Sequence, residues 1–118
     1  MSGNTYCEAN TASGKLVVVA EERAAGLVLR LQGSAAFEQA ERLDQQLQQL
    51  AKLAPRRIVF DLAELTAVSS LFLGALVRFR ATVLRRGGDV RLANLPPQVR
   101  FLFEITRLLD LFPMEEDA

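Results

Sequence analysis

Apolar residues follow two different spacings along the chain, and each spacing predicts one kind of element. Residues 16–20 and 27–31 are short runs rich in valine and leucine, which is typical of β-strands. Only residues 21–26 separate the two runs, so we expect an antiparallel pair joined by a turn. Gly33 and Ser34 follow the second run and are expected to end that strand.

The spacing changes to every three or four residues from Phe37 onward, with glutamine, glutamate and arginine in between. This spacing predicts an amphipathic helix that ends near Pro55. Its expected inner face consists of Phe37, Ala40, Leu43, Leu47, Leu50 and Ala54. The next run, residues 58–62, has almost no polar interruption, which favours a central strand covered on both faces.

The second half of the chain continues with alternating helix and strand. A long helix is predicted from about residue 70 to residue 86, where two glycines stop it, and residues 90–93 form the next strand. Pro96 and Pro97 can open a third helix, because a proline in the first turn loses no helical hydrogen bond. Residues 111–112 are expected to form a final short strand or a turn.

The predicted order of elements is therefore ββαβαβα. Strand–helix–strand units imply parallel strands, so we expect a single α/β domain with a mixed sheet of four to five strands and helices packed against it. The domain is predicted to span residues 15–114. Residues 1–14 are small and polar and are expected to be a flexible tail, or at most a loosely attached strand; residues 115–118 are expected to be an acidic, solvated tail.

Composition removes several classes of function. The chain has no histidine, which excludes zinc fingers and Ser-His-Asp triads, and its one cysteine, Cys7, forms no internal disulfide. Its 14 basic and 14 acidic residues balance, which gives no overall attraction to nucleic acid or to an anionic membrane. The sequence shows neither a signal peptide nor a membrane-spanning run, so we expect a cytoplasmic protein without a metal or a cofactor.

Basic residues gather along the second half of the predicted long helix, at Arg78, Arg80, Arg85 and Arg86. We interpret them as a solvated helix end that complements the helix dipole. A nucleic-acid surface would need aromatic residues interleaved with the arginines, and this pattern is absent from the sequence. Arg80 is unusual because it falls within the apolar stripe of the helix.

Residues 58–88 are the most informative segment of the chain. A buried strand ends in Asp61-Leu62, a short connection follows, and the next helix begins at Ser69 and Ser70. A serine at a helix start commonly caps the exposed backbone N–H groups of the first turn. The alternative is that the two serines form a functional surface.

This segment resembles the signature of the STAS family, which is named for sulfate transporters and anti-sigma factor antagonists. Asp61-Leu62 corresponds to the end of the family's strand, and Ser70 falls on its phosphorylatable serine. Further matches are Gly33, Thr66-Ala67-Val68, Leu73-Gly74-Ala75-Leu76, Arg85-Arg86-Gly87-Gly88 and residues 90–99. The chain departs from the family at three positions: Ser69 stands for an aspartate, Leu71 for a small polar residue and Phe72 for a glycine.

The resemblance implies a regulatory, protein-binding module and not an enzyme. Such a module docks onto an anti-sigma factor or a serine-kinase-like partner through the start of the helix at residues 69–72. Phosphorylation of Ser70, with Ser69 as the second candidate, would release the partner. The added charge of about −1.5 to −2 is tolerated at a helix N-terminus but not in a close-packed interface.

A helical projection at about 100° per residue extends the expected docking surface. Leu73, Leu76 and Val77 project toward the core, together with Val83 and Leu84. Leu71, Ala75 and Arg78 project outward, whereas Phe72 lies on the flank and either packs at the edge of the core or contacts the partner. The predicted partner-binding residues are Ser69, Ser70, Leu71, Phe72, Gly74, Ala75 and Arg78.

Two alternatives stay open at the level of sequence. The chain could be a STAS module that does not switch, such as a scaffold or the accessory subunit of a lipid-transport ATPase. An enzyme is disfavoured, because the carboxylates of Asp61, Glu64 and Asp89 are not placed with a nucleophile or a metal site. Both a monomer and a weak homodimer are compatible with the sequence.

Overall fold

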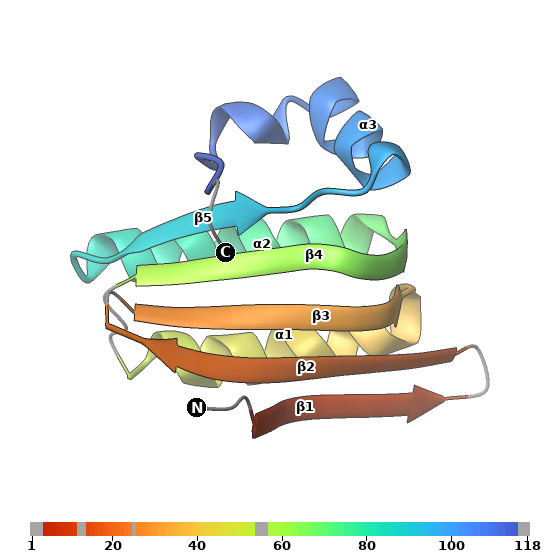
Figure 1. Ribbon diagram of the computed structural model, residues 1–118, viewed down its shortest axis with the longest axis horizontal. Coiled ribbons are helices and arrows are strands. Elements are labelled where there is room, and N and C mark those ends of the chain that lie inside the picture. The colour runs from red at the N-terminus through yellow and green to blue at the C-terminus, as the bar shows by residue number, and fades with distance from the viewer. Residues whose placement is uncertain (1–3, 12–13, 25, 54–56, 116–118) are drawn as a thin grey trace.

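The structure is a computed structural model that describes residues 4–11, 14–24, 26–53 and 57–115. In this part of the chain, five strands form one mixed sheet: β1 (Asn4–Thr11), β2 (Gly14–Arg23), β3 (Gly26–Ala35), β4 (Arg57–Val68) and β5 (Asp89–Ala93). Their order across the sheet is their order along the chain (Figure 1). β1, β2 and β3 are antiparallel neighbours, whereas β3, β4 and β5 run parallel.

Two helices connect the parallel strands and cover one face of the sheet (Figure 1). α1 (Phe37–Ala51) follows β3, and α2 (Ser70–Arg85) joins β4 to β5. α3 (Pro97–Ile105) and the short 3-10 helix η1 (Leu108–Asp110) lie beyond the β5 edge of the sheet. The chain then returns to β5, where the Leu92 N–H donates to the Pro113 carbonyl oxygen at 3.0 Å. The prediction of a single α/β domain with a mixed sheet is confirmed.

The main core lies between the sheet and the two connecting helices. Alternate residues of the parallel strands point into it, among them Leu29 and Leu31 of β3 and Phe60 of β4, and all three side chains are fully buried. The ring of Phe60 meets the ring of Phe79 of α2 edge to face, with 5.6 Å between the centroids. Each fully buried side chain of this size contributes about 1.5–3 kcal/mol to folding, so this layer carries most of the stability.

The opposite face of the sheet has no helix over it in Figure 1, yet β4 is buried there as well. Val28, Val59 and Ala93 form a small buried cluster on that face. Next to it, Arg30 forms ion pairs with Glu21 and with Asp61, the latter at 3.4 Å between Nε and Oδ2. The expected burial of residues 58–62 is therefore correct, but on this face the cover comes from side chains of the neighbouring strands.

The prediction of a flexible N-terminal tail is wrong for residues 4–11, which form β1. The backbone of β1 pairs antiparallel with β2 from Asn4 opposite Ala20 to Thr11 opposite Gly14, with a bulge between Thr5 and Cys7. The other alternative considered for this segment, a strand attached to the sheet, is the correct one for residues 4–11. An edge strand pairs on one side only, so a polar sequence without a regular apolar pattern can still occupy it.

The parallel strands β3 and β4 are both longer than predicted. β3 does not end at Gly33 and Ser34 but continues to Ala35, and β4 continues through the expected connection as far as Val68. The extension is possible because the two strands pair in parallel up to Ala35 opposite Val68, with two shifts of register on the way. The Thr66 hydroxyl also donates to the Gly33 carbonyl oxygen at 3.0 Å.

The ends of α1 and of the domain also differ from expectation. α1 ends at Ala51, and Ala54 and Pro55 lie outside the described residues. Leu92 and Met114 form an isolated parallel bridge, so the final strand-like contact falls after residues 111–112. Glu115 was expected in a solvated tail, but its N–H donates to the Leu92 carbonyl oxygen at 2.7 Å. Residues 116–118, the rest of that tail, lie outside the described residues.

Candidate functional site

The start of α2 holds the two serines of the signature segment in different roles. Ser69 is the N-cap residue with extended backbone, and its Oγ accepts a hydrogen bond from the Phe72 N–H at 3.2 Å. Ser70 is the first helical residue and is exposed. The cap therefore depends on Ser69 and leaves the Ser70 hydroxyl out of the helix-capping contact, while both hydroxyls lie at the positive end of the helix dipole.

We predict that Ser69→Ala lowers the free energy of unfolding by about 1 kcal/mol, because the N–H of Phe72 loses its acceptor. Ser69→Asp should keep the stability of the wild-type chain, since aspartate caps as well as serine. Ser70→Ala is the matched control and should change stability by less than about 0.5 kcal/mol. Urea denaturation followed by circular dichroism measures all three; equal losses in the two alanine variants would contradict the assignment of the cap.

The predicted partner-binding residues do not all reach the surface. Ser70 and Arg78 are exposed, and Ser69, Leu71 and Gly74 are partly exposed. Phe72 and Ala75 are fully buried, so their prediction as partner contacts is wrong. Of the two readings of Phe72, packing in the core is the correct one.

The helical projection fails because α2 packs on two sides. Its buried residues are Phe72, Ala75, Leu76, Phe79 and Val83. Ala75 lies on the flank that faces α1, where Arg78 donates to Asp44 of α1 at 2.8 Å. Conversely, Leu84 was expected in the core and is 39% exposed. Compared with the projection, the buried face of α2 is thus rotated toward Phe72 and Phe79 and toward α1.

An exposed aromatic residue that the apolar pattern did not predict lies at the same edge of the molecule. β3 and β4 are parallel and end opposite each other, so α1 and α2 begin side by side (Figure 1). Phe37 opens α1 and is 63% exposed, although the periodicity assigned it to the inner face. Side chains of a helix lean toward its N-terminus, so the first apolar residue projects past the helix end and away from the core. The position of Phe37 as the first apolar residue of the helix was therefore the signal in the sequence that could have indicated its exposure.

Arg80 has a partner within the fold. Its guanidinium carbon lies 5.9 Å from the centroid of the Phe112 ring, close enough for a cation–π contact. Phe112 in turn meets Phe103 of α3 edge to face at 6.4 Å between centroids. The arginine inside the apolar stripe of α2 therefore contacts the C-terminal segment next to β5.

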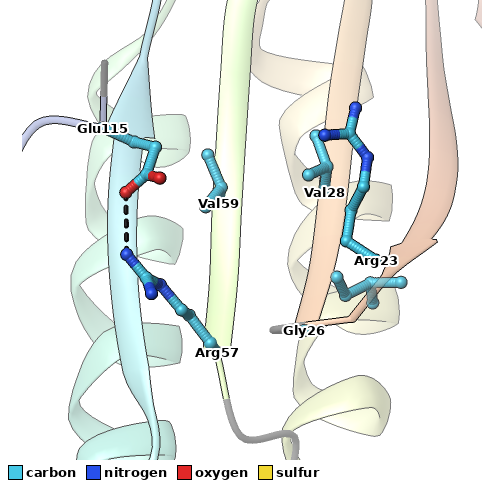
Figure 2. A pocket seen from close by; sticks show the side chains of 7 residues that line it. Arg23, Gly26, Val28, Arg57, Val59 and Glu115 are labelled. Atoms are coloured by element: carbon cyan, nitrogen blue, oxygen red, sulfur yellow. Dashed lines mark hydrogen bonds and ion pairs between the residues drawn. The ribbon is translucent and has the colours of Figure 1, made fainter. Parts of the chain in front are cut away.

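The open face of the sheet carries a shallow hollow near the start of the parallel strands (Figure 2). Val28 and Val59 lie at its centre, with Arg23 on one side and Arg57 on the other. The Arg57 Nη2 donates to Glu115 Oε1 at 2.9 Å, so the charge of this arginine is already compensated. Among the described residues that line the hollow, none is a serine, threonine or cysteine that could act as a nucleophile.

Two of the three carboxylates considered for an enzyme, those of Asp61 and Asp89, are engaged in ion pairs, and Glu64 lines a small hollow together with Asp61 and Arg30. Asp61 Oδ2 pairs with Arg30, and its Oδ1 accepts from the Ala63 N–H at 3.1 Å. Asp89 pairs with Arg91 at 2.7 Å. The hydrogen bond from Arg30 lowers the pKa of Glu21, which keeps that carboxylate ionised beside the arginine. Among the described residues, no group of three or more Cys, Asp or Glu side chains is arranged to hold a metal ion, and no helix is long and apolar enough to cross a membrane.

The chain belongs to the STAS domain family, whose model matches residues 16–118. Among curated proteins it is similar to BtrV of Bordetella bronchiseptica, which is provisionally named an anti-sigma factor antagonist. The two are 33% identical over 88 residues, which cover 75% of this chain and 76% of BtrV.

Solved structures with the same fold include an anti-sigma factor antagonist from Mycobacterium paratuberculosis, with a TM-score of 0.75, 20% identity and coverage of 84% of each chain. The anti-sigma factor antagonist SpoIIAA in its unphosphorylated form matches with a TM-score of 0.73 and 18% identity, over 86% of this chain and 88% of SpoIIAA. The phosphorylated form of the Bacillus SpoIIAA matches with a TM-score of 0.68 and 17% identity, over 86% and 91%. These likenesses establish the fold, which agrees with the resemblance seen in residues 58–88.

Proposed function

We propose that this chain is an anti-sigma factor antagonist, which docks onto an anti-sigma factor or a serine-kinase-like partner through the start of α2. The docking surface consists of Phe37, Ser69, Ser70, Leu71, Gly74 and Arg78. It combines an exposed aromatic ring, a partly exposed leucine and an exposed hydroxyl at one edge of the sheet. Aromatic anchors surrounded by polar groups are typical of protein interfaces.

The proposal rests above all on one observation: Ser70 is exposed, and its hydroxyl takes no part in the hydrogen bond by which Ser69 caps α2. A phosphate on Ser70 would leave the hydrogen bond from Phe72 to Ser69 intact. It would add a charge of about −1.5 to −2 at a helix N-terminus, which the dipole favours by roughly 0.3–1 kcal/mol. The same charge is costly when a partner covers it, because a buried, unpaired charge loses its hydration. Phosphorylation would therefore switch docking without unfolding the domain.

The geometry also favours Ser70 over Ser69 as the modified residue. Ser69 is only partly exposed, and its Oγ is the acceptor that holds the first turn of α2. Esterifying that oxygen would disturb the cap before it affected a partner. The two solved forms of SpoIIAA, unphosphorylated and phosphorylated, support the general idea that a STAS fold survives phosphorylation.

We predict that Ser70→Glu weakens partner binding at least about tenfold, whereas Ser70→Ala keeps the wild-type affinity, since only glutamate brings an unpaired charge into the interface. The partner is obtained by affinity capture with the intact chain and identified by mass spectrometry, and binding is measured by isothermal titration calorimetry. Gln49→Glu adds one negative charge at an exposed position in the last turn of α1, at the opposite end of the helix from Phe37, and should leave affinity unchanged.

Equal affinities of the Ser70→Ala and Ser70→Glu chains would contradict the switch. Phosphosite mapping on the chain isolated from cells provides a second, independent readout. Phosphate at Ser70 on the unbound fraction, and not on the bound fraction, is the expected result. A chain that stays bound and carries no phosphate would instead favour a STAS scaffold or a transporter subunit that does not switch.

A further inference from the structure

α3 carries an apolar stripe that the described part of the fold leaves exposed. Phe101 and Ile105 are each 58% exposed, whereas Val99 and Phe103 of the same helix are buried. Phe101 and Ile105 are four residues apart, so they are neighbours on one helical face. Single exposed apolar residues are common, but two large ones at neighbouring positions on one helical face make a larger apolar patch.

The charges beside this stripe are arranged so that the surface complements itself. Arg100 and Glu104 lie along one flank of the stripe and form an (i, i+4) pair at 3.3 Å, with their side chains 49% and 53% exposed. Suppose that two identical α3 helices pack antiparallel, related by a two-fold axis. The flank that carries Arg100 and Glu104 in one copy then lies beside the same flank of the other copy, and the two flanks run in opposite directions. Arg100 of one copy then faces Glu104 of the other, as charged flanking positions do in coiled coils.

The apolar residues meet in the same arrangement. The midpoint between Phe101 and Ile105 is residue 103, and the midpoint between Arg100 and Glu104 is residue 102. The two midpoints differ by one residue, a height of about 1.5 Å along the helix. One two-fold axis therefore brings Phe101 against Ile105 of the second copy and satisfies both charge pairs at once.

We propose that a second copy of this chain occupies the α3 stripe, in an antiparallel, two-fold symmetric dimer. α3 has nine residues, so the contact falls well below the standard interface area of about 1,600 Å². The dimer is accordingly weak and forms in a concentration-dependent equilibrium with the monomer. The inference depends on α3 alone and does not depend on the function proposed for Ser70.

Sedimentation velocity of the full chain tests the proposal over about 10 μM to 1 mM, the range in which so small an interface associates. The wild-type chain should shift from the mass of one chain to the mass of two. Phe101→Glu should stay a monomer throughout. Leu53→Glu, the same change of charge at a leucine that is 76% exposed at the end of α1, should associate like the wild type. Circular dichroism checks that each variant is folded.

Charge reversal distinguishes this dimer from other associations. Arg100→Glu and Glu104→Arg should each weaken self-association at least about tenfold, because like charges then face each other across the two-fold axis. An equimolar mixture of the two variant chains should associate again, since every facing pair is opposite in charge. The intrahelical pair stays broken in both chains, so recovered association cannot come from restored helix stability.

Three results would overturn the proposal. The first is a wild-type chain that remains monomeric at the highest concentration, including the case in which the stripe binds a different protein. The second is a Phe101→Glu chain that dimerises as well as the wild type. The third is a mixture of the two charge variants that associates no better than either variant alone.

Discussion

Replacing Phe72 by alanine should lower the free energy of unfolding by about 3–5 kcal/mol. The side chain is fully buried in the main core at the first turn of α2. Its removal leaves a cavity between the sheet and the helix, and the neighbouring strands and helix can close it only in part. A loss of this size is a large fraction of the stability of a domain of 118 residues.

The matched control for Phe72 is Phe37, the exposed phenylalanine at the start of α1. Phe37→Ala should change the free energy of unfolding by less than about 0.5 kcal/mol, because its ring already faces water. Guanidinium chloride denaturation of the two variants gives the comparison. A stability loss in Phe72→Ala no greater than in Phe37→Ala would mean that Phe72 is not a core residue, and would return it to the docking surface.

A second large effect is expected at Gly33 of β3, where backbone conformation and space act together. Gly33 has φ of +107°, and a Cβ at this position would lie 2.1 Å from the Lys15 carbonyl oxygen of β2. Gly33→Ala therefore combines backbone strain of about 1–3 kcal/mol with an overpacking cost of similar size. The Lys15 carbonyl belongs to the β2 backbone, which pairs with β3 and cannot move aside without loss of hydrogen bonds.

Gly87 provides the control that separates strain from crowding. Its φ of +85° is also left-handed, but a Cβ added there would meet no atom within 4 Å. Gly87→Ala should therefore cost only about 1–2 kcal/mol, the conformational part alone. Thermal unfolding of both variants should show a clearly larger drop in Tm for Gly33→Ala. Similar drops in the two variants would show that the contact with Lys15 relaxes easily.

The fold could be predicted from the sequence where elements carry a strong apolar pattern. α1 and α2 fall close to the expected ranges, and β2 and β4 contain the expected runs 16–20 and 58–62, because burial against one common core selects their periodicity. β1 did not have this signal, since an edge strand is held by backbone pairing on one side. The continuation of β4 to Val68 was also hidden, because it depends on the register with β3 and not on local composition.

The candidate site was predicted in part, for a similar reason. The position of Ser70 followed from the motif, and the capping role of Ser69 followed from the chemistry of serine at a helix start. The orientation of Ala75 required knowing that α1 packs beside α2, which no pattern within α2 reveals. The exposure of Phe37 required the exact first residue of α1, and helix boundaries are the least certain part of a pattern-based prediction.

The agreement between strand order in the sheet and strand order in the chain has a consequence for folding during synthesis. Because β1 to β5 lie across the sheet in sequence order, each strand leaves the ribosome after the neighbour on which it must pair. No strand has to be inserted between two that are already in place, and only one edge of the growing sheet awaits its next partner at any time. Met114, which forms a short bridge with Leu92 at the β5 edge, is synthesised after all five of these strands.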